Sequence, residues 1–192
     1  QASLDAQLHL PAGYSISYGG AYSEQQQSFR ELMMILSLAV LLVFAVLMFL
    51  FREWRISLTV LFISVLGICG CLLALWLTGV PLNVSSYTGI IMVVGIIAEN
   101  AIFTVWQYRM NRRTGGDVSE AVDYAIALRI RPKLMTAIGA VLALMPLALG
   151  IGLGAQMQQP LAVAVIGGFI VGLPLLLLVL PSIMLLIYKK SK

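Results

Sequence analysis

Five long apolar stretches constrain this chain more than any other feature of its sequence. A helix needs about 20 mostly apolar residues to cross the hydrocarbon core of a bilayer, and five segments meet that requirement: 32–51, 56–78, 86–108, 134–153 and 161–187. Of the 192 residues, 60% are hydrophobic and only 10% are charged, whereas soluble domains are about 45–50% apolar and about 25% charged. The composition excludes an ordinary globular enzyme and a disordered chain. The sequence predicts an all-α integral membrane protein with five spans.

The basic residues predict how these spans are oriented. Of the 12 lysines and arginines, all but Arg30 lie in three segments: 52–55, 109–133 and 188–192. The two segments that alternate with them, 79–85 and 154–160, carry no charge. Because cytoplasmic segments of membrane proteins are enriched in Lys and Arg, we expect the N-terminus outside and the C-terminus in the cytoplasm. The same distribution explains the net charge of +4 without a nucleic-acid partner.

Residues 1–31 differ from the rest of the chain. Large and small residues alternate over 14–18, between Pro11 and the pair Gly19-Gly20, which is typical of a short strand bounded by turns. The polar segment 23–31 contains neither Gly nor Pro and is expected to continue as a helix into the first span. One strand cannot form a sheet, and the first residue is not Met. We therefore interpret this β/α region as the end of an external domain in a processed or excised chain.

The segment between the third and fourth spans carries a helix signal of its own. Asp117 is a favourable N-cap residue, and Glu120 completes a capping-box pattern. An apolar stripe follows at three- and four-residue spacing: Val118, Ala121, Val122, Ala125 and Leu128. We expect a cytoplasmic surface helix over about 117–128, with Pro132 in the first turn of the fourth span.

Glu99 is the one acidic residue that lies within a predicted span. An ionisable group at the centre of a membrane helix costs about 2.5–3.5 kcal/mol on insertion scales, so we expect it to face the bundle interior and to have a partner. Gly95, one turn earlier on the same face, leaves room for a neighbouring helix or a water molecule, and Asn100 adds an amide. Two interpretations remain open: a group that binds and releases protons, or a member of a structural ion pair.

Lys133 and Thr136 lie where the fourth span begins. Lys133 is either a relay cation or a side chain that extends to the membrane surface. Thr136 is either a relay hydroxyl or a residue that bonds its own backbone. These positions are candidates, and the pattern alone does not choose between the alternatives.

Small residues complete the list of candidates. Gly168 and Gly172 form a GxxxG pattern in the fifth span, which favours close helix packing. Cys69 and Cys71 are interpreted as small packing residues. The chain has a single histidine and no metal-ligand spacing, so we expect neither a metal site nor a cofactor.

Several strings together resemble the C-terminal membrane region of the resistance-nodulation-division (RND) efflux transporters, from the eighth to the twelfth helix. The strings are LPAGY at 10–14, GG at 19–20, EQQ at 24–26, GIIAENAI at 95–102, RIRPKLMT at 129–136, PLA at 146–148, GIGLG at 150–154 and GG at 167–168. They occur in the family's order, and together they extend over essentially the whole chain. Each string alone would be weak, but the ordered combination is specific.

The resemblance implies a transporter in the bacterial inner membrane, in which protons serve as the coupling ion for export of metals, drugs or other toxic compounds. It also implies a trimer, a periplasmic adaptor, an outer-membrane channel and an N-terminal half that supplies intramembrane aspartates. The drug-exporting branch has Lys where this chain has Glu99, whereas the heavy-metal branch has an acidic residue there and a Lys at the position of Lys133. The family's relay threonine corresponds to Thr136. The resemblance thus assigns Glu99, Asn100, Lys133 and Thr136 to a proton relay.

Two other classes of function remain open at this point. Protein-export subunits share this membrane fold but move polypeptide, and a chain without the relay aspartates could be a noncatalytic scaffold. The sequence of the external domain would separate the first alternative from efflux, and proton-coupled flux would separate the second.

Overall fold

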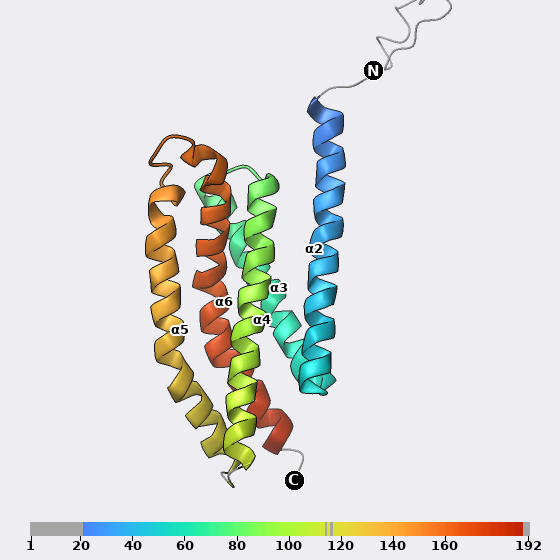
Figure 1. Ribbon diagram of the computed structural model, residues 1–192, viewed down its shortest axis with the longest axis vertical. Helices are drawn as coiled ribbons and strands as arrows, with labels where there is room; N and C mark the ends of the chain where they lie inside the picture. The colour runs from blue at the N-terminus through green and yellow to red at the C-terminus, as the bar shows by residue number, and fades with distance from the viewer. Residues whose placement is uncertain (1–20, 114, 116, 190–192) are drawn as a thin grey trace, which may run out of the picture.

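The computed structural model describes residues 21–113, 115 and 117–189. Within these residues the chain is a bundle of long helices (Figure 1): α2 (Ala21–Phe51), α3 (Trp54–Thr78), α4 (Val84–Arg113), α5 (Val118–Ala148) and α6 (Ala155–Lys189). All 5 are long and apolar enough to cross a membrane. The all-α membrane fold with five spans is therefore confirmed. The strand predicted over 14–18 lies outside the described residues.

Glycines allow α3 and α6 to approach each other closely. A Cβ atom added to Gly70 would lie 2.9 Å from the carbonyl oxygen of Gly167, so the two backbones are in contact. Gly168 and Gly172 also lie on α6 and face α4. A Cβ atom added to Gly168 would lie 2.5 Å from Cγ2 of Val93, and one added to Gly172 would lie 2.9 Å from Cδ1 of Ile97. The packing role predicted for Gly168 and Gly172 agrees with these contacts.

Gly95 behaves differently. A Cβ atom added to it would meet no atom within 4 Å in the described part of the chain. The neighbouring helix for which this glycine was expected to leave room is not one of α2–α6. The prediction of a packing role for Gly95 is therefore not met within this chain.

The predicted surface helix and the fourth span are one continuous helix, which corrects the expected boundaries. α5 runs from Val118 to Ala148 and contains Pro132 in its interior rather than in a first turn. Figure 1 shows the early part of α5 inclined toward the end of α4, and an interior proline permits such a bend because its ring excludes a normal backbone hydrogen bond. The predicted stripe is buried except for Leu128, which is 47% exposed. Asp117 occupies the N-cap position without a side-chain capping hydrogen bond.

α5 also ends earlier than predicted, at Ala148 instead of residue 153. The connection to α6 contains Gly150, Gly152 and Gly154 with φ values of 71°, 120° and 79°. Left-handed backbone of this kind is open to glycine and strained for other residues. The helix therefore stops where these glycines begin, and α6 already starts at Ala155, within the segment expected to be a loop.

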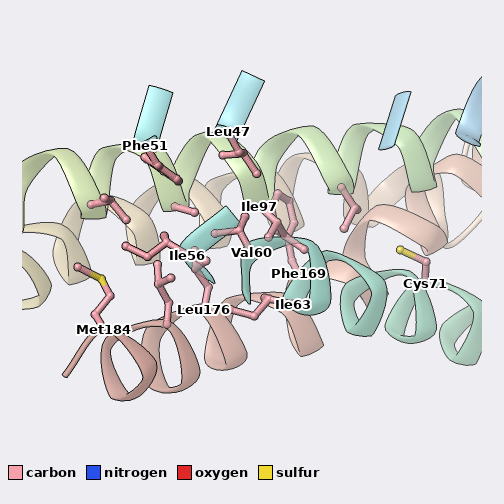
Figure 2. Packing of buried hydrophobic residues seen from close by; sticks show 14 of the residues in the cluster. Leu47, Phe51, Ile56, Val60, Ile63, Cys71, Ile97, Phe169, Leu176 and Met184 are labelled. Atoms are coloured by element: carbon pink, nitrogen blue, oxygen red, sulfur yellow. The ribbon is translucent and has the colours of Figure 1, made fainter. Parts of the chain in front are cut away.

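α2 joins the bundle near its C-terminal end. Leu47 and Phe51 are buried, whereas Met34, Leu38 and Leu41 are more than half exposed. Figure 1 shows the end of α2 beside the start of α3, and near its beginning α2 contacts α4 through the rings of Phe29 and Tyr87, whose centroids lie 5.2 Å apart. Figure 2 shows Leu47 and Phe51 directed from α2 into the core that contains Ile56, Val60 and Ile97.

Polar contacts fasten this junction at the end of the bundle where α2 meets α3, here called the basic end because Arg52, Arg55 and Arg109 lie there. The Arg109 guanidinium donates to the carbonyl oxygens of Leu50, at 3.4 Å, and of Phe51. It also lies 3.9 Å from the carboxylate of Glu53. The hydroxyl of Tyr188 in α6 donates to the same carboxylate at 2.6 Å. The turn between α2 and α3 is thereby tied to both α4 and α6.

Candidate functional site

A cavity of about 350 Å³ lies among α4, α5 and α6 and brings the predicted relay residues together. Glu99 and Asn100 line it from α4, and Lys133 and Thr136 line it from α5. The polar lining also includes Arg129. The remaining walls are apolar and come from all three helices: Ile96, Phe103, Pro132, Ala137, Ala140, Phe169 and Leu173. Residues more than 30 positions apart in the sequence thus share one partly polar site inside an apolar bundle.

Lys133 is buried and hydrogen-bonded rather than extended toward water. Its side chain is 4% exposed, and its Nζ donates to Thr104 Oγ1 at 2.7 Å. A cation in such surroundings is costly without a partner, so this bond stabilises its position. The geometry excludes the interpretation of Lys133 as a side chain that reaches the membrane surface.

Thr104, the partner of Lys133, was not predicted from the sequence as a residue of this site. It lies on α4, is 3% exposed and donates its own hydroxyl hydrogen to the carbonyl oxygen of Asn100 at 2.9 Å. A signal was present: Thr104 is a further polar residue inside the third span, and it follows Asn100 by four positions, on the same helix face. That spacing could not show, however, that the partner of Thr104 lies on α5.

Glu99 lines the cavity but is exposed in this chain. No ion pair joins it to Lys133 or Arg129 within 4.0 Å in the structure described. Asn100 donates its side-chain amide to the carbonyl of Ile96 at 2.9 Å, within its own helix. The acid and the cation of the candidate site are therefore present in one cavity but are not paired with each other.

Glu99 also belongs to an uncovered stripe on α4. The stripe consists of exposed residues at helical spacing: Met92, Gly95, Glu99, Phe103 and Trp106. A carboxylate exposed among apolar side chains has no partner in hydrocarbon. On this face of α4, the carboxylate of Glu99 therefore has no ion-pair partner among the described residues.

Thr136 and Arg129 occupy the α5 side of the cavity. Thr136 Oγ1 donates to the carbonyl oxygens of Pro132 and Lys133, at 3.1 and 3.0 Å, so its hydroxyl bonds its own backbone, as the simpler interpretation expected. Arg129 was expected only as a charge at the membrane surface. Its guanidinium lies 4.7 Å from the centre of the Phe103 ring, and its buried Nε has no hydrogen-bond partner among the described residues. The cavity therefore contains one acid and two cations.

A helical membrane bundle whose spans place an acid and two cations around one cavity is typical of membrane transporters, and comparison with known proteins supports that class. The model of the AcrB/AcrD/AcrF family matches residues 1–188. The chain therefore belongs to this family of RND efflux transporters, as its sequence motifs predicted.

The similar proteins include heavy-metal resistance proteins. The cobalt-zinc-cadmium resistance protein CzcA of Cupriavidus metallidurans is 34% identical over 192 residues, which are 100% of this chain and 18% of that protein. The nickel and cobalt resistance protein CnrA of the same species is 33% identical over 189 residues, with coverage of 98% and 18%. The crystal structure of a heavy metal efflux pump matches with a TM-score of 0.78 and 35% identity, over 98% of this chain and 19% of that one. The chain thus spans about a fifth of the proteins it matches.

Proposed function

We propose that this chain forms the C-terminal membrane part of a proton-driven RND efflux transporter for heavy-metal ions. The observation that carries the proposal is the cavity in which Glu99 of α4 and Lys133 of α5 lie together. The names of the similar proteins favour metal ions over drugs as substrate. They also favour efflux over polypeptide export. In this arrangement the bundle lies in the bacterial inner membrane with its basic end in the cytoplasm.

The relay proposed for this site uses the exchange of hydrogen-bond partners. Protonation of Glu99 removes a negative charge from the cavity, and release of the proton restores it. Lys133 and the hydroxyl of Thr136 lie on the neighbouring helix and line the same space, so they respond to that change of charge. A change of partners between two packed helices can bias their relative position, which is how proton binding would be coupled to a change of access.

The uncovered stripe on α4 supports a partner outside this chain. Glu99 is exposed there, and Gly95 has open space beside it in the described residues. In the proposed transporter, the N-terminal half covers this stripe and brings the intramembrane aspartates that act with Glu99. The trimer, the periplasmic adaptor and the outer-membrane channel belong to the same proposal.

The test is transport by the full-length transporter in proteoliposomes, with Zn²⁺ as substrate and an imposed pH gradient. Glu99→Gln keeps the size and hydrogen-bonding capacity of the side chain but cannot ionise. We expect the variant to assemble normally and to lose gradient-driven Zn²⁺ transport. Glu120→Gln is the matched control, because Glu120 is an exposed acid on α5 outside the cavity. Full gradient-driven transport by Glu99→Gln would contradict the relay and favour a structural role for Glu99.

A further inference from the structure

The contact between Lys133 and Thr104 is the most fully buried polar contact between two helices of this bundle described here. The two side chains are 4% and 3% exposed, and the Nζ–Oγ1 distance is 2.7 Å. The contact joins α5 to α4 directly beside the cavity that holds Glu99. Its position suggests that it controls where the Lys133 cation rests.

The hydroxyl of Thr104 is set up to accept from Lys133. Its hydrogen is directed to the carbonyl oxygen of Asn100 at 2.9 Å, which leaves its lone pairs available for a donor. A lysine ammonium has three donors and no acceptor. The β-branched side chain of Thr has few rotamers in a helix, so the backbone bond holds the acceptor in one place.

This resting place is separated from the carboxylate. Thr104 follows Glu99 by five residues, which is about 7.5 Å along the helix axis, and the side chains of Lys133 and Glu99 form no ion pair within 4.0 Å in the structure described. The charged groups that face the cavity are Glu99 from α4 and Arg129 and Lys133 from α5, while α6 contributes Phe169 and Leu173. Thr104 thus holds one of two cations at a distance from the acid.

We propose that Thr104 is a positioning residue of the relay, which retains Lys133 beside α4 and away from Glu99 until the charge of the cavity changes. The proposal rests on the proposed proton-driven function. Its consequence is that the Thr104 hydroxyl sets the pH range in which the transporter works. Without this acceptor, Lys133 moves to the carboxylate and stabilises its ionised form, so more acid is needed to protonate Glu99.

The experiment compares Thr104→Val with Thr104→Ser in the full-length transporter. The initial rate of Zn²⁺ transport is measured as a function of pH on the proton-supplying side. We expect Thr104→Val, which keeps the shape and loses the hydroxyl, to lower the pH of half-maximal transport by about one unit, the size of one hydrogen bond to a charged group. Thr104→Ser keeps the acceptor and is expected to retain the pH of the unmodified protein.

Thr59→Val is the matched control. Thr59 lies on α3, is 8% exposed and also donates to its own backbone, to the carbonyl of Arg55 at 2.8 Å, but it is not among the residues that line the cavity. A merely structural role for Thr104 would lower the amount of assembled protein in both Val variants and leave the pH midpoint where it was. An unchanged midpoint in Thr104→Val, or the same shift in Thr59→Val, would overturn the proposal.

A second measurement covers the case in which Thr104→Val assembles but does not transport. Infrared titration of the Glu99 carboxyl, identified by the signal lost in Glu99→Gln, gives the same midpoint without transport. Thr104→Ala serves in place of Thr104→Val if the Val side chain prevents assembly. Failure of the relay itself is distinguishable: Glu99→Gln would then retain gradient-driven transport. If Glu99→Gln is inactive and the Thr104→Val midpoint is unchanged, the role of Thr104 alone is wrong.

Discussion

Two regions of the bundle differ in whether they find their packing partners within this chain. One is the contact between α3 and α6, and the other is the exposed face of α4. Between α3 and α6, Gly70 and Gly167 bring two backbones together, and no side chain larger than hydrogen fits. On the exposed face of α4, Gly95 has open space beside it and Glu99 has no ion-pair partner among the described residues. Both regions contain glycine in a membrane helix, yet Gly70 lies in a close helix contact within the chain and Gly95 does not. The comparison indicates that the contact between α3 and α6 is completed within this chain, whereas the exposed face of α4 leaves Glu99 without an ion-pair partner among the described residues.

Gly70→Leu tests the complete side and is expected to have the largest effect on stability. A Cβ atom at Gly70 would lie 2.7 Å from Cβ of Val171 and 2.9 Å from the carbonyl oxygen of Gly167, and backbone atoms cannot move aside as a flexible side chain can. We expect the free energy of unfolding in detergent to fall by about 3 kcal/mol or more, the upper range for an overpacked core. Gly139→Leu is the control, since a Cβ atom there meets nothing within 4 Å in the described structure. Equal stability of the two variants would show that α3 and α6 are not in backbone contact.

Gly95→Leu tests the open side, with an intermediate effect that depends on the length of the protein. In this chain alone, we expect the thermal unfolding temperature to change little, because an added side chain meets no atom of the described residues. In the full-length transporter, a helix packed on the α4 stripe would meet the new side chain, at a cost of about 1–3 kcal/mol. A similar result in both proteins would mean that nothing covers this stripe, and it would weaken the proposed N-terminal partner.

Hydropathy predicted the number of membrane helices in this fold but not all of their ends. Runs of apolar residues identified five spans because each needs nearly the whole bilayer thickness. The ends of the fourth span were wrong at both sides for physical reasons. Pro132 is accommodated inside α5, and the residues 149–154 are apolar or glycine, so hydropathy continues where the positive φ values of Gly150, Gly152 and Gly154 stop the helix.

The site was predictable to a different degree. Glu99, Asn100, Lys133 and Thr136 stood out as polar residues at or within apolar segments, and all four line one cavity. The pairing of Lys133 with Thr104 instead of Glu99 could not be predicted. It depends on the rotation of α5 about its axis and on its depth relative to α4, and spacing along one helix specifies neither. Their functional roles remain predictions for the experiments above.

Glu53→Gln at the basic end is expected to have the smallest effect and tests whether a polar contact in the complete part of the bundle is more than a surface pair. Glu53 lies 3.9 Å from Arg109, with side chains 39% and 36% exposed, and exposed pairs of this kind are worth about 0.2–1 kcal/mol. Gln keeps an oxygen that can accept from Tyr188, whose hydroxyl now donates to Glu53 at 2.6 Å, so the substitution removes the charge and retains a hydrogen bond. Arg109 also keeps its bonds to the carbonyl oxygens of Leu50 and Phe51. We therefore expect the free energy of unfolding to fall by less than about 1 kcal/mol, and the remaining dependence on salt concentration to be weak. A loss comparable with that of Gly70→Leu would instead mean that the turn between α2 and α3 depends on the Glu53 charge, and that the complete part of the bundle is held by electrostatics as well as by close helix packing.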